Sequence, residues 1–151
     1  MKCVETIQAE VRNLQTPVPL LTAHCESVLL PKGLLGFEDY KGYTLTTNPG
    51  EEPFAWLSVE GKVSLAFVVI DPFIALPDYQ PDIPQADVEF LGLKQPGDAL
   101  LYGIVTLHEG RTPTVNLKGP VVVNRHTRIG KQVIIANATA YSVEHPLPVE
   151  T

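Results

Sequence analysis

Short apolar segments separated by turn signals recur along this chain at a spacing of roughly ten residues, which is typical of all-β domains. Residues 43–47 are β-branched or aromatic at four of five positions, and the turn-forming run Asn48-Pro49-Gly50 follows them. Residues 54–59 read as a strand, which would place Phe54, Trp56 and Ser58 on one face. The chain's 14 prolines and 11 glycines suit a fold with many turns.

The longest apolar run lies within residues 64–71 and is apolar on both faces, which predicts a central strand. Residues 85–91 predict one short helix, with Val88 and Leu91 three positions apart. The regular strand spacing favours a single antiparallel all-β domain, a sandwich or a barrel, over an α/β sheet. The remaining predicted strands are residues 28–30, 99–107, 120–124 and 131–136, the last two joined by a turn at 125–130.

The composition fits one domain, residues 1–151, that folds without added crosslinks, since 44% of the residues are hydrophobic. The two cysteines, Cys3 and Cys25, predict two free thiols in a reducing compartment; a single bridge between them is the alternative. Glu5 and Glu10 interrupt the stretch in which a signal peptide would need an apolar core. We therefore expect a cytoplasmic protein with no membrane association.

Charge is distributed unevenly along the chain, whose net charge is −6. Residues 111–143 contain five basic residues and no acidic residue, whereas the first 110 residues are strongly acidic. The basic stretch is either a site for an anion or acidic partner, or a set of solvated turns and strand ends. The acidic remainder would repel nucleic-acid phosphates, so we expect no direct binding to nucleic acid.

Motifs for catalysis, metal binding and phosphate binding are missing from the sequence. The four histidines have no partners at metal-ligand spacing, and no nucleophile elbow or phosphate-binding loop occurs. We therefore predict no catalytic residue, no metal and no cofactor. Asp71 and Asp78 flank a proline-bent loop, where an aspartate usually caps backbone amides. The alternative is a small-molecule-binding or hydrolytic β-barrel that uses Asp71, Asp78 and His126.

The apolar strand at residues 99–107 carries apolar side chains on both faces. Such a strand is either central and covered on both faces, or an edge whose outer face binds another protein. The second possibility makes Leu101, Ile104 and Val105 candidate partner-binding residues.

Several segments, taken together and in order, resemble the FliW family over residues 28–147. They are Leu30-Pro31-Lys32-Gly33-Leu34-Leu35-Gly36-Phe37-Glu38-Asp39-Tyr40, Leu65-Ala66-Phe67-Val68-Val69-Ile70-Asp71-Pro72-Phe73, Pro77-Asp78-Tyr79, Ile104-Val105-Thr106, Thr114-Val115-Asn116-Leu117-Lys118-Gly119-Pro120-Val121-Val122-Val123-Asn124, Gly130-Lys131-Gln132-Val133-Ile134, Tyr141-Ser142 and His145-Pro146-Leu147. The first 27 residues diverge from the family pattern, as does the run Val115-Asn116-Leu117. These departures bear on which surface binds a partner.

The resemblance implies a small, mostly antiparallel, barrel-like domain in the bacterial cytoplasm that works as a monomer and catalyses no reaction. It also implies two protein partners, flagellin and the translational repressor CsrA, which compete for the protein. While bound to the FliW-type protein, CsrA does not occlude flagellin mRNA. The family motifs predict a structural role for twelve residues: Gly36, Asp71, Pro72, Asp78, Tyr79, Asn116, Pro120, Asn124, Arg128, Gln132, His145 and Pro146.

CsrA-type proteins are basic, so an acidic surface of this chain would attract them. Glu51, Glu52 and Glu89 are the acidic residues for which we predict contact with such a partner. The basic stretch would then remain for flagellin or for solvent.

Overall fold

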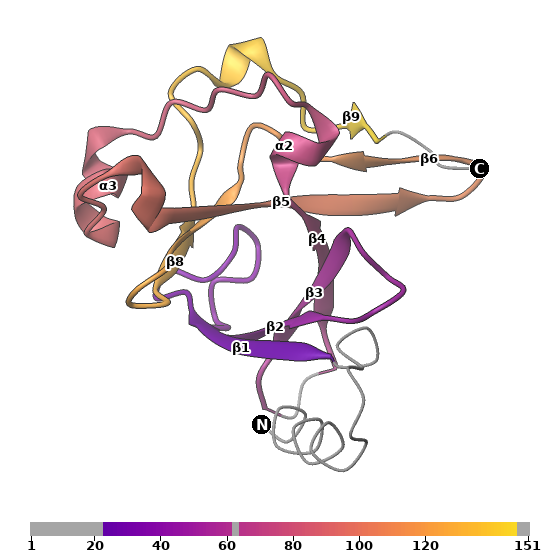
Figure 1. The fold of residues 1–151 in the computed structure, drawn as a ribbon, viewed down its shortest axis with the longest axis horizontal. Coiled ribbons are helices and arrows are strands. Elements are labelled where there is room, and N and C mark those ends of the chain that lie inside the picture. The colour runs from indigo at the N-terminus through magenta and orange to yellow at the C-terminus, as the bar shows by residue number, and fades with distance from the viewer. Residues whose placement is uncertain (1–22, 62–63, 148–151) are drawn as a thin grey trace, which may run out of the picture.

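Antiparallel β-structure dominates the computed structural model, which describes residues 23–61 and 64–147 (Figure 1). The helical segments are short: α2 (Pro72–Ala75), α3 (Gln85–Leu91), and the 3₁₀ turns η2 (Pro96–Asp98) and η3 (Ala138–Ala140). The strands are β1 (His24–Leu29), β2 (Gly42–Thr47), β3 (Phe54–Val59), β4 (Ala66–Ile70), β5 (Ala99–His108), β6 (Arg111–Val115), β7 (Val121–Asn124), β8 (Gly130–Gln132) and β9 (His145–Pro146).

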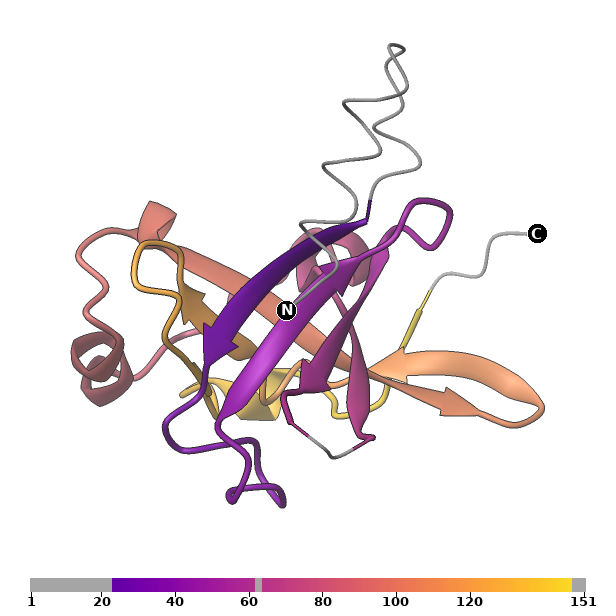
Figure 2. The same cartoon turned by 90° about the horizontal axis from the view of Figure 1, so that it is seen from below.

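Strand β5 organises the sheet, because its ten residues pair with three other strands. The order β1-β2-β3-β4-β5-β6-β9 forms one path, and β7 pairs with the first half of β5 and with β8. Strands β1 to β4 curve as one layer, and the β5–β6 hairpin projects away from it (Figure 2). The helix α3 lies at the opposite end of β5 from this hairpin (Figure 1).

The sheet curls toward a barrel without closing into one. A single parallel bridge, Leu29 with Ile129, links the end of β1 to the turn before β8. The backbone N–H of Leu29 also donates to the carbonyl oxygen of Arg128 at 3.0 Å. The all-β, mainly antiparallel, barrel-like prediction is therefore confirmed.

The alternation in β3 shows how the core is built. Ala55, Leu57 and Val59 are buried, whereas Phe54, Trp56 and Ser58 lie together on the other face, the outer one. That these three share a face was predicted; that it is the outer face was not. The main core cluster combines buried residues of β1 to β4 and β7; a second cluster gathers under α2 around β6 and the C-terminal segment.

Two predicted elements match the structure residue for residue: the strand β3 and the helix α3. The prediction of a central strand is also right for β4, which lies between β3 and β5. The prediction of only one helix omitted the four-residue α2, which begins at Pro72.

The predicted strand at residues 131–136 is wrong beyond Gln132, where β8 ends. Val133 and Ile135 are nevertheless buried, and their backbone N–H groups donate to the carbonyl oxygens of Pro120 and Lys118. Regular pairing stops there because Pro120 has no N–H to donate to a ladder.

The expectation of two free thiols is wrong for Cys25, which is disulfide-bonded on β1. A cysteine count limits the number of bridges but does not decide whether one forms. Cys3 and most of the divergent region at residues 1–27 lie outside the described residues, and β1 begins at His24. Within the described part of the chain, no helix has the length and apolar character needed to cross a bilayer.

Candidate partner-binding surfaces

The three residues of the predicted hydrolytic site do not form one catalytic group. Asp71 caps helix α2, since its Oδ1 accepts a hydrogen bond from the backbone N–H of Phe73 at 2.9 Å. Asp78 is exposed in the loop that follows α2. His126 instead pairs with Asp98, with 3.0 Å between its Nε2 and Asp98 Oδ1. The turn-capping interpretation of Asp71 is confirmed, and the geometry gives the hydrolytic alternative no support.

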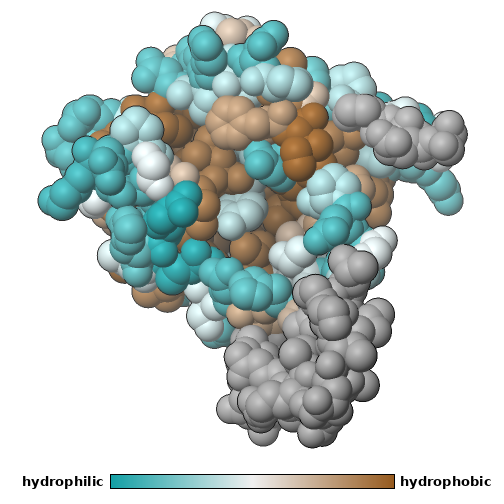
Figure 3. Space-filling view, viewed as in Figure 1, coloured by the Kyte–Doolittle hydropathy of each residue, from teal (hydrophilic) through white to brown (hydrophobic). Residues whose placement is uncertain are grey.

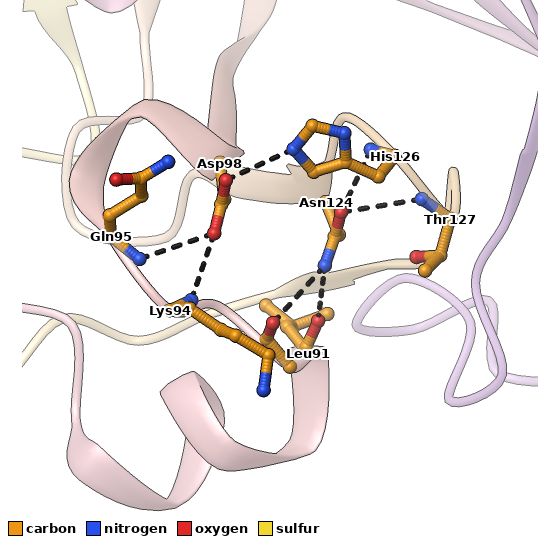
Figure 4. Close-up of polar contacts among 8 residues, drawn as sticks. Leu91, Lys94, Gln95, Asp98, Asn124, His126 and Thr127 are labelled. Carbon is orange, nitrogen blue, oxygen red and sulfur yellow. Dashed lines mark hydrogen bonds and ion pairs between the residues drawn. The ribbon is translucent and has the colours of Figure 1, made fainter.

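Asp98 lies at the centre of a polar network between η2 and the β7–β8 turn (Figure 4). Its Oδ2 accepts hydrogen bonds from the backbone N–H groups of Lys94 at 2.9 Å and Gln95 at 3.2 Å. These bonds and the contact with His126 hold the pKa of the Asp98 carboxyl below its ordinary value, with the Lys94 amide the largest cause. No sequence motif marks Asp98, so its place in this network could not be predicted from the sequence.

Asn124 occupies the other half of this network (Figure 4). Its Nδ2 donates to the carbonyl oxygen of Leu91 at 2.8 Å, and its Oδ1 accepts from the backbone N–H of His126 at 2.8 Å. The buried side chain therefore ties the end of α3 to the β7–β8 turn, which accounts for a structural role.

Other family-motif residues also make bonds within the fold. Asn116 Oδ1 accepts from the backbone N–H groups of Lys118 and Gly119 at 3.0 and 3.1 Å, an Asx-type turn. Gln132 bridges two segments, because it accepts from the Leu35 amide at 3.0 Å and donates to the Gly119 carbonyl at 2.9 Å.

Tyr79 and Arg128, two further family-motif residues, also contact other parts of the fold. The Tyr79 hydroxyl donates to the Leu117 carbonyl oxygen at 2.6 Å, and burial raises the pKa of the phenol well above its ordinary value. Arg128 has a positive φ of 62° and forms an ion pair of 2.6 Å with Glu26. The remaining motif residues lie as follows: Gly36 in a turn with φ of 87°, Pro72 buried at the start of α2, Pro120 buried before β7, and His145 and Pro146 in β9.

Three of the five basic residues in the stretch 111–143 form ion pairs within the fold. Arg128 pairs with Glu26, Lys131 pairs with Asp87, and Arg111 Nη2 lies 4.0 Å from Glu144 Oε1. These pairs favour the interpretation of solvated turns and strand ends over an anion site.

The predicted acidic residues Glu51 and Glu52 border an open groove of about 440 Å³ on the outer face of the sheet, here called the acidic groove. Its apolar floor comes from β3, β4 and the β5–β6 hairpin. Trp56 is 36% exposed there and Leu107 66%, so two large apolar side chains of one groove are open to solvent. The lining residues are Gly50, Glu51, Glu52, Phe54, Trp56, Val68, Leu107 and Pro113.

Leu101 and Ile104 lie in two other grooves. Leu101 lines an apolar groove of about 550 Å³ between α2, α3 and the start of β5, here called the helix groove. Ile104 lines a groove of about 390 Å³ beside the 31–41 loop, here called the loop groove. Val105 is only 7% exposed and packs in the core, so its side chain has no surface to offer a partner. The strand β5 is central, paired on both sides, and the edge-strand interpretation is wrong.

Glu89 is separate from the other predicted acidic contacts. It is exposed on α3, where it accepts a hydrogen bond from Gln85 at 3.2 Å. Lys32 and Lys131 both lie within 6 Å of the ring of its neighbour Phe90. Of the six predicted contact residues, Val105 lies in the core and the other five are spread over several surfaces. On the face seen in Figure 3, hydrophobic residues (brown) gather in the middle and hydrophilic residues (teal) surround them.

Within residues 23–61 and 64–147, no three histidine, cysteine, aspartate or glutamate side chains gather closely enough to hold a metal ion.

Comparisons with known proteins agree on one family. The family model described as FliW protein matches residues 13–147 of this chain. The flagellar assembly factor FliW of Moorella thermoacetica is 37% identical over 119 residues, which cover 78% of this chain and 75% of that protein. The flagellar assembly factor FliW of Anoxybacillus flavithermus is 41% identical over 125 residues, which cover 82% of this chain and 85% of that protein.

A solved structure supports the same assignment. A crystal structure of the flagellar assembly factor FliW superposes with a TM-score of 0.72 at 35% identity. The match covers 83% of this chain and 87% of the other.

Proposed function

This chain belongs to the FliW family of flagellar assembly factors, and we propose that it acts by binding two proteins in turn, flagellin and the translational repressor CsrA. Bound CsrA would be kept from flagellin mRNA, so flagellin synthesis would continue. Unexported flagellin would occupy the protein instead, release CsrA and reduce synthesis. No chemical reaction is part of this cycle.

The observation that supports the proposal is that open apolar grooves with acidic residues at the rim lie on the protein surface. The polar networks of the fold, such as that of Asp98 and Asn124, instead hold loops and turns together. Large apolar side chains are exposed in open grooves, and Glu51 and Glu52 lie beside one of them. Open apolar grooves with charged rims suit protein recognition better than catalysis.

Charge also supports the choice of partners. The chain has a net charge of −6, and several of its basic side chains are already paired with acids. A basic RNA-binding protein would be attracted to such a surface, whereas RNA itself would be repelled.

A switch between two partners requires only that each reduces the affinity for the other. A coupling of about 1.4 kcal/mol would change the affinity for CsrA tenfold. We propose Glu51, Glu52 and Glu89 as contacts for the basic partner, and Leu101 and Ile104 as apolar contacts. These five residues lie on different surfaces of the protein. The two partners could therefore bind at separate surfaces.

We also propose that the protein acts in the cytoplasm, where flagellin and its mRNA are made. Disulfides are uncommon there, so the bond at Cys25 has to be tested in cells. Alkylation of the protein in intact cells, followed by mass spectrometry, would show whether Cys25 is a thiol or is oxidised.

Isothermal titration calorimetry of the purified chain against flagellin and CsrA from the same organism tests the proposal. We expect saturable binding of each protein. A strain that lacks the chain should show too little flagellin and poor motility. Failure of both proteins to bind, together with normal motility, would contradict the proposed function.

A further inference from the structure

The acidic groove contains the chain's single tryptophan, Trp56. Its indole lies on the outer face of β3, and its neighbours on the paired strands are Thr46 and Val68. The indole is only partly covered, and Leu107 of the projecting hairpin exposes more of its surface than any other large apolar side chain in the described part of the chain. Two large apolar surfaces therefore line the same groove and remain open to solvent.

The carboxylate of Glu51 is held in place at this groove. Its Oε1 accepts hydrogen bonds from Trp56 Nε1 at 3.0 Å and from Asn48 Nδ2 at 2.9 Å. The two donors lower the pKa of the Glu51 carboxyl, with Asn48 the larger cause, so the group stays charged at neutral pH. Neither bond uses Oε2. The bonds therefore fix the orientation of the carboxylate beside the indole and leave one oxygen for another donor.

Charge in the acidic groove is of one sign. Glu51 and Glu52 are both exposed, and no lysine, arginine or histidine is among the residues that line the groove. Arg111 lies two residues before Pro113, which lines the groove. Its guanidinium contacts Glu144 and His108 instead of the groove's two acids. The two acids of the groove therefore have no cationic partner among its lining residues.

We propose that the acidic groove is the docking site for a cationic segment of the basic partner protein, one that carries a lysine or arginine beside an apolar side chain. This inference rests on the proposed function, since it assigns a surface to one of its two partners. The cation would lie against the Trp56 indole and between the two carboxylates, where ring and charge both attract it. The neighbouring apolar side chain would cover Leu107 and Pro113.

The alternatives fit the groove less well. An acidic segment or a nucleic acid would meet two uncompensated carboxylates. A purely apolar helix would cover the indole and Leu107 but leave both acids without a partner, which costs affinity. The helix groove, in contrast, has no acidic residue in its lining and suits such an apolar partner better.

Fluorescence of Trp56 tests the inference directly, because it reports on this groove and on no other part of the chain. The full chain would be titrated with CsrA at low ionic strength while emission is recorded, and calorimetry would measure affinity in parallel. The Trp56→Phe variant measures any emission from the partner itself. We expect the emission of Trp56 to shift on binding.

Variants separate the groove from general electrostatics. The double variant Glu51→Gln/Glu52→Gln keeps an oxygen that can accept from Trp56 and Asn48, so the loop should keep its shape. We expect it to bind CsrA about tenfold more weakly at low salt. The matched control Asp39→Asn/Asp82→Asn removes two exposed carboxylates outside the groove and should bind as the unmodified chain does.

Calorimetry distinguishes the two ways in which this can fail. If CsrA binds but Trp56 emission and the affinity of the double glutamine variant are unchanged, the groove assignment is wrong and the proposed function stands. If neither CsrA nor flagellin binds the unmodified chain, the proposed function fails, and this assignment fails with it.

Discussion

Nδ2 of Asn124 donates a hydrogen bond to the carbonyl oxygen of Leu91 at 2.8 Å, which fastens the C-terminal end of α3 to β7. The two residues are 33 positions apart, and the side chain is 4% exposed. Because α3 forms one wall of the helix groove, this bond also fixes the shape of a candidate binding surface.

The variant Asn124→Ala should lower the free energy of unfolding by about 2–3 kcal/mol, because it leaves buried backbone groups without partners. Chemical denaturation measures this loss. The variant Asn137→Ala, at a half-buried residue whose two side-chain bonds lie at the surface, serves as a comparison and should cost less. Equal stability of Asn124→Ala and the unmodified chain would contradict a structural role.

Asp71→Ala should lower the melting temperature through the loss of the α2 cap, with a cost of about 1 kcal/mol. The matched variant Asp78→Ala, in the exposed loop after α2, should leave the melting temperature nearly unchanged. Both are measured by thermal unfolding. If Asp71→Ala were fully stable but failed to bind a partner, the capping role would be wrong.

Glycine substitutions in the 31–41 loop should differ in cost. Gly33 and Gly36 both have positive φ, 68° and 87°, so alanine at either position is strained by about 1–2 kcal/mol. At Gly33 an added Cβ would also lie 2.6 Å from Cα of Glu38, whereas at Gly36 it would meet nothing within 4 Å. Gly33→Ala should therefore be clearly less stable than Gly36→Ala in urea unfolding. Similar midpoints would contradict this account of the loop.

Asp98 should contribute to the dependence of stability on pH. Its pKa is lowered in the folded chain, so its stabilising contribution is complete above the ordinary aspartate pKa of about 4. The contribution is lost as the pH falls from there through the lowered folded pKa. Unfolding measured between pH 2 and pH 7 should show a shallower acid limb for Asp98→Asn. An unchanged acid limb would mean that other carboxyls dominate it.

The sequence predicted elements best where local signals decide the structure. Phe54–Val59 is a short, largely apolar segment that lies between turn-forming residues, and Gln85–Leu91 has Val88 and Leu91 three positions apart; both were located correctly. Strand β6 was missed because its sequence Arg-Thr-Pro-Thr-Val has few apolar residues and contains Pro113. It forms because the hairpin with β5 and the short β9 pair with it, which is tertiary information.

The candidate surfaces were only partly predictable. Charge alone pointed to Glu51 and Glu52, and the period of a strand placed Trp56 on the same face as Phe54 and Ser58 without showing that this face is the outer one. The presence of Leu107 in the same groove depends on how the β5–β6 hairpin leaves the sheet, which no local pattern reveals. The pairing of His126 with Asp98 is similarly a long-range contact, across 28 residues.

Competition between the two proposed partners tests the central claim most directly. Labelled flagellin leader RNA bound to CsrA would be mixed with this chain, and flagellin would then be added in increasing amounts. The account predicts that the chain displaces the RNA from CsrA and that flagellin restores the CsrA–RNA complex. RNA that stays bound to CsrA whatever the concentration of the chain would contradict it.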